Sequence, residues 1–168
     1  YEADGLAATL PGPWRSHCDT EVLARLLQVE GTRGLDRVRG MFALAAWWPT
    51  RRRLLLARDP LGIKPLVWTV AGAAGGLEVV AASEIPAVLD HPWVRAEPDW
   101  VTASAYLTTI RLVLDDRTLY AGIRGVRPGE RIEIDCTGPV PRCRHELDPR
   151  LAAIWPDAEP AASSGASD

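Results

Sequence analysis

The sequence predicts an α+β domain built from stacked layers of strands and helices. Its 168 residues suit one domain, and hydrophobic residues make up 47% of them, which is enough to form a core. Residues 41–48 are apolar at every position, so a strand formed there needs cover on both faces. An apolar stripe at helical spacing precedes this run, at Val22, Leu23, Leu26 and Leu27. A doubly covered strand beside an amphipathic helix favours a layered structure.

The first two helices have recognisable boundaries. Tyr1–Leu10 is typical of the end of a helix, and the Pro-Gly-Pro sequence that follows it stops the helix. Asp19 or Thr20 is expected to cap the second helix through a side-chain oxygen, and Gly31 is expected to end it.

Two more helices are expected in the second half of the chain. Ser83 suits the N-cap of a short helix through Leu89, in which Pro86 is tolerated because it falls in the first turn. Asp99 is expected to start the last helix, and its apolar surface comes from Trp100, Val101, Ala105 and Leu107.

Short strands are expected between and after these helices. A glycine-rich loop at Ala71–Gly76 joins two of them, and Arg127-Pro128-Gly129 forms a turn between another two. The expected strands are Met41–Trp48, Arg53–Arg58, Val67–Val70, Leu77–Ala82, Thr118–Ile123 and Glu130–Asp135.

Composition excludes several classes of protein. A net charge of −3 gives no electrostatic case for binding nucleic acid or an anionic membrane. No apolar run is long enough to cross a bilayer, and no signal-peptide pattern opens the chain, so we expect a cytoplasmic protein. The three cysteines are an odd number without regular spacing, which argues against a disulfide scaffold.

The two ends of the sequence suggest a fragment. The chain begins with Tyr1, and Met41 is its only methionine. From Pro156 onward the residues are Ala, Ser, Gly, Pro, Asp and Glu, which cannot bury enough apolar area to offset the entropy of ordering. We therefore expect residues 156–168 to be a disordered tail.

A cysteine at position 18 stands between His17 and Asp19, an arrangement that suggests a nucleophile. Adjacent residues in an extended segment point to opposite faces, however, and a thiol needs its base within hydrogen-bond reach. From the residues alone, Asp19 is better explained as a helix cap than as part of a catalytic group.

Cys136, Cys143 and His145 do not form a convincing metal site. The two cysteines are seven positions apart, whereas metal sites usually bring ligands in tight pairs, and no fourth ligand is evident. We expect a loop with incidental thiols there, and a solvated turn at Arg51-Arg52-Arg53.

The segment Arg58–Leu66, with the sequence RDPLGIKPL, is the most distinctive in the chain. Two prolines and a glycine fix its backbone, and Arg58 and Asp59 could pair at its entry. Lys64 is the only lysine of the protein. Physics alone predicts a rigid turn between strands, suited either to structure or to docking.

Several motifs in order resemble one known family. The glutaminase domain of glutamine-hydrolysing asparagine synthetases is closely similar over roughly residues 1–135. The resemblance rests on Asp19-Thr20-Glu21-Val22, Arg39–Leu44, Ala57–Leu66, Ala82-Ser83-Glu84-Ile85, Asp115–Tyr120, Gly122-Ile123 and Arg127-Pro128-Gly129-Glu130.

The resemblance implies a fold and a chemistry. The implied fold is the four-layer αββα sandwich of N-terminal nucleophile hydrolases, incomplete here at its N-terminus. In the family an N-terminal cysteine attacks the side-chain amide of glutamine, its own amino group is the base, and an Asn-Gly pair stabilises the oxyanion. Ammonia then passes to a synthetase domain that uses ATP and Mg²⁺. The resemblance also allows a homodimer of the parent protein.

The resemblance carries few site residues onto this chain. Asp19 is similar to the aspartate that holds the α-ammonium group of glutamine. The nucleophilic cysteine is expected upstream of Tyr1, so we expect no catalytic residue and no metal ligand here. The residues expected to be structural or to lie at the interface with the synthetase domain are Arg58, Asp59, Gly62, Lys64, Ser83 and Glu84.

These expectations define a domain plan and a function. Residues 1–137 are a partial amidotransferase domain, 138–155 a divergent segment and 156–168 the tail. The parent would be an ATP-dependent asparagine synthase that takes ammonia from glutamine, and the 168-residue chain alone would be inactive. Alternatives are a non-catalytic scaffold domain of a related β-lactam or lasso-peptide cyclase, and amidophosphoribosyltransferase, which shares the Arg-Asp-Pro-x-Gly loop.

Overall fold

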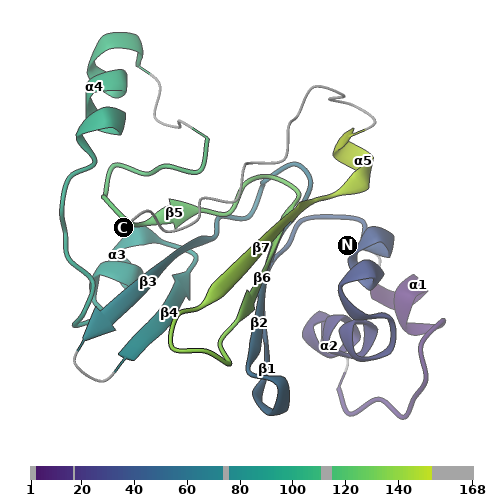
Figure 1. The fold of residues 1–168 in the computed structure, drawn as a ribbon. Helices are drawn as coiled ribbons and strands as arrows, with labels where there is room; N and C mark the ends of the chain where they lie inside the picture. Colours follow the sequence, from purple (N-terminus) through teal and green to yellow (C-terminus); the bar gives the residue numbers. More distant parts are fainter. Residues whose placement is uncertain (1–2, 17, 74–75, 111–114, 153–168) are drawn as a thin grey trace.

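Two antiparallel sheets stack between helices in a computed structural model that describes residues 3–16, 18–73, 76–110 and 115–152 (Figure 1). One sheet has the strand order β1-β2-β6-β7 and the other β4-β3-β5. The strands are β1 (Ala43–Trp48), β2 (Arg53–Arg58), β3 (Val67–Ala73), β4 (Gly76–Ala82), β5 (Arg124–Gly125), β6 (Glu130–Asp135) and β7 (Arg142–Leu147). The helices are α1 (Ala3–Ala7), α2 (Asp19–Glu30), α3 (Ile85–Leu89), α4 (Trp100–Thr109) and α5 (Pro149–Ala152), with 3₁₀ turns at Gly31–Arg37 and Pro49–Arg51.

Two hydrophobic cores hold the layers together. Helices α1 and α2 pack on the first sheet through a core that includes Leu26, Leu35 and Leu55. A second core, with Leu56 and Ile132 at its centre, lies between the two sheets. Helix α3 lies against β3 and β4 on the far side. The order helices, sheet, sheet, helix confirms the predicted αββα sandwich.

Much of the predicted secondary structure is confirmed. Strands β2 and β6 have the predicted bounds, and Gly31 ends α2 with a φ of 65°. Asp99 caps α4 by accepting a hydrogen bond from the backbone N–H of Thr102 at 2.9 Å. The apolar residues predicted for α4 are largely exposed, with Trp100 at 75% and Leu107 at 81%. No helix among the described residues is long and apolar enough to cross a membrane.

Strand β1 is less enclosed than its sequence predicts. The described residues give it one partner, β2, so it lies at an edge of their sheet and not in the middle. Its Leu44, Ala46 and Trp48 side chains pack on the helix-side core, but Trp47 on the opposite face is 49% exposed. The apolar run reflects partial cover on the helix-side face and less cover on the other.

Two predicted helix caps are wrong. Cys18 is the N-cap of α2, and Asp19 is the first residue inside the helix. Glu84, not Ser83, is the N-cap of α3. Among the described residues the Glu84 side chain makes no capping hydrogen bond, and Cys18 offers the backbone N–H of Thr20 only a weak thiol acceptor, so neither helix starts at a strong cap.

The strand predicted at Thr118–Ile123 is also wrong. The Thr118 hydroxyl donates to the carbonyls of Tyr120 at 3.1 Å and Ile123 at 2.9 Å, and it accepts from the N–H of Tyr120. These local bonds fold the segment into turns, because a threonine side chain competes with strand pairing for backbone groups. Pairing with β3 is limited to Arg124–Gly125.

The C-terminal part of the described chain is a strand and a short helix, where the sequence predicted a loop. Strand β7 pairs with β6 along its whole length, and Cys143 and His145 lie on it. The Arg150 guanidinium then donates to the Asp148 carboxylate and to the Val38 carbonyl, the latter at 3.0 Å. The Val38 contact joins the C-terminal segment to the end of the 3₁₀ turn Gly31–Arg37. The predicted tail, residues 156–168, lies outside the described residues.

Candidate functional site

The loop after β2 is held by Arg58. Its guanidinium donates three hydrogen bonds to backbone carbonyls, those of Gly62 at 2.6 Å, Lys64 at 2.7 Å and Val126 at 2.8 Å. Planar guanidinium groups suit such a fork of acceptors. Arg58 therefore joins its own loop to the distant turn before β6.

Asp59 holds the same loop from inside. Asp59 is only 1% exposed, and its carboxylate accepts hydrogen bonds from the backbone N–H groups of Leu61, Ile63 and Lys64, each at 3.1 Å. Its backbone carbonyl also accepts from Gly129 at 2.9 Å. The suggested Arg58–Asp59 ion pair is not among the contacts of the described residues, because each side chain serves backbone groups instead.

Gly62 and Lys64 shape the outer surface of the loop. Gly62 has a φ of +64°, and an added Cβ would lie 2.7 Å from Cγ of Pro128, so only glycine fits without strain. The side chains at the tip face outward, with Leu61 79% and Ile63 53% exposed and Lys64 also exposed. A backbone fixed from inside thus presents apolar side chains and one ammonium group outside.

Ser83 and Glu84 are exposed residues in the bend between β4 and α3. The next residue, Ile85, lines a pocket of about 470 Å³ together with Arg58, Pro65 and the segment Asp115–Tyr120. The structure therefore brings the loop and the start of α3 to one pocket. Their role at a domain interface stays a prediction.

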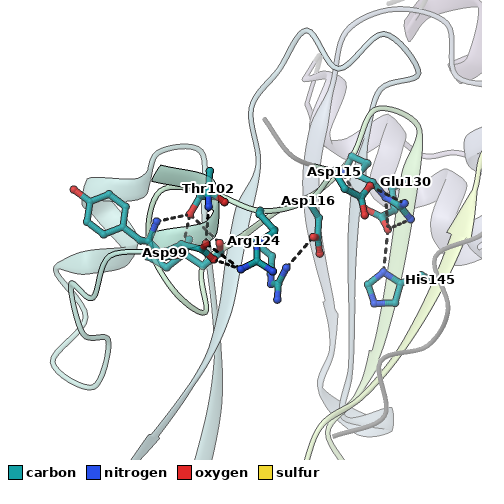
Figure 2. Close-up of polar contacts among 12 residues, drawn as sticks. Asp99, Thr102, Asp115, Asp116, Arg124, Glu130 and His145 are labelled. Carbon is teal, nitrogen blue, oxygen red and sulfur yellow. Dashed lines mark hydrogen bonds and ion pairs between the residues drawn. The ribbon is translucent and has the colours of Figure 1, made fainter. Parts of the chain in front are cut away.

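A buried carboxylate stands beside this pocket at the start of β6. Glu130 is 2% exposed, and its carboxylate accepts from the backbone and guanidinium of Arg127 and contacts Nδ1 of His145 at 2.9 Å (Figure 2). Burial acts to raise the pKa of Glu130, but the hydrogen bonds from His145 and Arg127 outweigh it and hold that pKa below its usual value. His145 was predicted to lie in a loop, and its position on β7 creates this contact.

Two further ion pairs fix the segment that follows α4. Asp99 accepts from Arg117 at 2.7 Å, and Asp116 accepts from Arg124 at 2.9 Å (Figure 2). The bond from the Thr102 N–H and then that from Arg117 lower the pKa of Asp99. Sequence reasoning missed these pairs, because their partners come together only in the folded chain.

Asp19 lies at the opposite side of the first sheet, in the exposed first turn of α2. Nearby, the Glu21 carboxylate accepts from the N–H groups of Arg15 and Ser16 and from the Ser16 hydroxyl, the last two at 2.7 Å. The bonds from Arg15 and then Ser16 lower the pKa of Glu21. Glu21 also lies 4.0 Å from the Arg25 guanidinium, so its charge is engaged within the protein, and Asp19 is the exposed acid of this helix start.

The three thiols differ in chemistry. Cys18 is exposed, and hydrogen bonds from the side chain and the backbone N–H of Thr20 lower its pKa. Cys136 and Cys143 pack against the core between the sheets, where burial raises the pKa of both. Among the residues that the structure describes, no hydrogen bond joins the Cys18 thiol to a base.

Comparisons with known proteins agree with these features. Residues 4–142 match the family described as the glutamine amidotransferase domain. A Mycobacterium tuberculosis protein named "Putative asparagine synthetase (glutamine-hydrolyzing)" is 40% identical over 127 residues, which are 73% of this chain and 19% of that protein. Asparagine synthetase (glutamine-hydrolyzing) 3 of Bacillus subtilis is 31% identical over 120 residues, 71% of this chain and 19% of that protein. Amidase chry2 of Gibberella zeae is 32% identical over 139 residues, 83% of this chain and 19% of that protein. The chain spans about a fifth of the length of these relatives.

Proposed function

Because this chain belongs to the glutamine amidotransferase domain family, we propose that it is the glutaminase part of an ATP-dependent asparagine synthase. In that role it serves to release ammonia from glutamine for the amidation of aspartate. The observation that carries the proposal is the match over residues 4–142, supported by relatives named as glutamine-hydrolysing.

In this proposal Asp19 binds the α-ammonium group of glutamine. Its exposed position in the first turn of α2 leaves the carboxylate within reach of a small molecule. A charge-assisted hydrogen bond to an ammonium group is stronger than a neutral one and also orients the ligand. The amide to be hydrolysed lies at the other end of the glutamine molecule.

The synthetase part is proposed to dock on the loop Arg58–Leu66. Leu61 and Ile63 are exposed on a backbone that Arg58 and Asp59 hold rigid, as suits an interface that forms without further ordering. ATP and Mg²⁺ belong to that synthetase part in the proposal. Within the described residues, no three His, Cys, Asp or Glu side chains are grouped as metal ligands.

A second candidate function is a non-catalytic scaffold domain, and the properties of the three thiols are compatible with it. Cys136 and Cys143 are held protonated by burial, and Cys18 has no base among the hydrogen-bond partners that the described residues provide. Nucleophilic catalysis by a thiol needs such a base or an equivalent activating group. On either candidate, the 168-residue chain alone does not hydrolyse glutamine.

Glutamine binding tests the role of Asp19. We expect the full chain to bind L-glutamine in isothermal titration calorimetry, and Asp19→Asn to weaken binding about tenfold or more. Asp4→Asn is the matched control, since Asp4 is also an exposed acid in the first turn of a helix, α1. Equal affinities for the Asp19 variant and the unaltered chain would remove Asp19 from the site.

Ammonia release separates the two candidates. The glutaminase proposal predicts that a longer form of the protein releases ammonia from glutamine, whereas the scaffold alternative predicts that no form does. Ammonia can be followed with a coupled glutamate dehydrogenase assay. Turnover by the 168-residue chain itself would overturn the statement that it is inactive alone, and loss of that turnover in Cys18→Ala would assign the nucleophile to Cys18.

A further inference from the structure

A pocket of about 510 Å³ opens between the end of α2 and the hairpin of β1 and β2. This volume falls in the range of roughly 300–1,000 Å³ that is usual for small-molecule sites. Helix α2 runs from Asp19 to Glu30, so its two ends lie roughly 17 Å apart at 1.5 Å per residue. The pocket is therefore separate from the proposed glutamine contact at the start of the helix.

The pocket has an apolar wall. Leu27 of α2, Trp48 of β1 and the β2 residues Leu54 and Leu55 line it. Leu55 is fully buried and Trp48 is partly exposed, while the Leu54 side chain packs on the opposite face of the sheet, against the core between the sheets. Such a wall suits an aliphatic or aromatic group of a ligand.

The pocket is also lined by polar side chains that are not held by contacts within the described chain. With respect to the rest of the described chain, none of them makes a hydrogen bond or an ion pair. They are Gln28, Thr32, Thr50, Arg51, Arg53 and Glu133. Polar groups that are not engaged within the protein are available to a ligand.

The charges of the pocket are ordered along the sheet. Glu133 lies opposite Leu55 in the pairing of β2 with β6, and Arg53 lies two residues closer to the hairpin turn that carries Arg51. The C-terminus of α2, whose carbonyl groups give it partial negative charge, ends at Gly31 on the pocket wall. Asp135, which lies opposite Arg53, offsets part of the arginine charge, so Arg51 and Arg53 together leave the hairpin side positive while the side of Glu133 and the helix end is negative.

We propose that this pocket binds a free α-amino acid with an apolar side chain. The carboxylate of the ligand pairs with Arg51 and Arg53, its ammonium group with Glu133, and its side chain packs on Trp48 and Leu27. Guanidinium groups match carboxylates in geometry as well as in charge. The site is independent of the proposed glutaminase function, because it shares no residue with the start of α2.

Calorimetric titration of the full chain with three leucine-based probes tests the proposal without altering the protein. L-Leucine has both charges, L-leucinamide lacks the carboxylate and 4-methylpentanoate lacks the ammonium group. We expect saturable binding of L-leucine, and affinities at least tenfold lower for each of the other two probes. Equal affinity for all three probes, or no binding of L-leucine, would overturn the proposal.

Variants assign each charge of the ligand to its partner. Glu133→Gln should weaken L-leucine at least tenfold and leave 4-methylpentanoate unchanged, while Arg53→Ala should weaken L-leucine and leave L-leucinamide unchanged. Glu97→Gln and Arg95→Ala are controls, because these two exposed side chains lie far along the chain and outside the pocket lining. Unchanged thermal melts show that each variant is folded. Retained binding of 4-methylpentanoate by Glu133→Gln, and of L-leucinamide by Arg53→Ala, shows the same for the pocket.

The glutamine site needs its own control. Asp19→Asn should leave L-leucine binding unchanged. A loss of leucine binding in this variant would place the ligand at the start of α2 and overturn the proposed pocket. Failure of the Asp19 variant to affect glutamine, with leucine behaving as expected, would instead count only against the proposed function.

Discussion

The loop Arg58–Leu66 and the start of α2 are built in opposite ways. In the loop, the side chains of Arg58 and Asp59 make hydrogen bonds to six backbone groups, and Gly62 packs against Pro128. At the start of α2, Glu21 accepts hydrogen bonds from Arg15 and Ser16, while Asp19 lies at the surface. The two charged residues that open the loop hold backbone groups, whereas the first residue of α2 is an exposed acid.

This contrast changes what the motifs mean. RDPLGIKPL is the most recognisable sequence of the chain, yet Arg58 and Asp59 bind backbone groups of the fold, and only Lys64 and the apolar side chains of its tip are left to contact a partner. The less distinctive Asp19 has the exposure that binding requires. A strong motif can therefore mark a scaffold, while the proposed glutamine contact rests on a residue that no distinctive motif surrounds.

Asp59→Ala should break the scaffold most severely. The substitution removes the acceptor of three backbone N–H groups. Because Asp59 is only 1% exposed, little water can replace its carboxylate. We expect the free energy of unfolding to fall by about 3–5 kcal/mol, measured by urea denaturation. Asp59→Asn keeps one oxygen for Leu61 and Ile63 and should lose less. A loss below about 1 kcal/mol for the alanine variant would show that solvent replaces the carboxylate.

Glu130→Gln should give the next largest loss in the free energy of unfolding, and this loss should appear near neutral pH and not at acidic pH. At pH 7 the loss of the charge beside Arg127 and His145 should cost about 2–3 kcal/mol. The pKa of Glu130 is lowered in the folded protein, so its stabilisation is present above the unfolded value of about 4.3 and is lost as pH falls through the folded pKa.

The difference in unfolding free energy between the unaltered chain and Glu130→Gln should therefore shrink as pH falls from 5 toward 3. Chemical denaturation at several pH values measures it, and other carboxylates cancel in the difference. A difference that stays constant over this range would mean that the charge of Glu130 does not stabilise the fold.

Gly62→Ala tests the backbone of the loop. The positive φ and the approach of Pro128 should together cost about 2 kcal/mol. Gly5→Ala is a control of opposite sign, because Gly5 lies inside α1 with open space around it and alanine there should stabilise by about 0.5–1 kcal/mol. Thermal melts of both variants give the comparison. Equal behaviour of the two would mean that the loop adapts and is not rigid.

The sequence allowed prediction where a signal is local. Strands β2 and β6 follow from their own residues, Gly31 ends α2 because its positive φ favours glycine, and Asp99 caps α4 through the next turn. These features need no knowledge of distant contacts. The family resemblance added the layer order, which no local pattern contains.

Prediction failed where distant partners decide the structure. Strand β7 alternates charged residues with Cys143 and His145, and it becomes a strand because β6 pairs with it and the inter-sheet core accepts Cys143. The Glu130–His145 contact depends on that pairing, so it was not visible beforehand. Thr118 shows the reverse case, since bonds from its own side chain overrode a strand-like pattern.

Thiol reactivity should show the smallest effect on stability and the clearest difference between inward and outward groups. Hydrogen bonds from Thr20 lower the pKa of the exposed Cys18, while burial raises the pKa of Cys136 and Cys143. Because the thiolate is the reactive form, iodoacetamide near pH 7 should label one thiol of the folded chain quickly and two slowly. Cys18→Ala should remove the fast phase and change the free energy of unfolding by less than about 0.5 kcal/mol. Three equal rates in the folded chain would mean that the thiols between the sheets are open to solvent, which would contradict the packing that places β7 on the inter-sheet core.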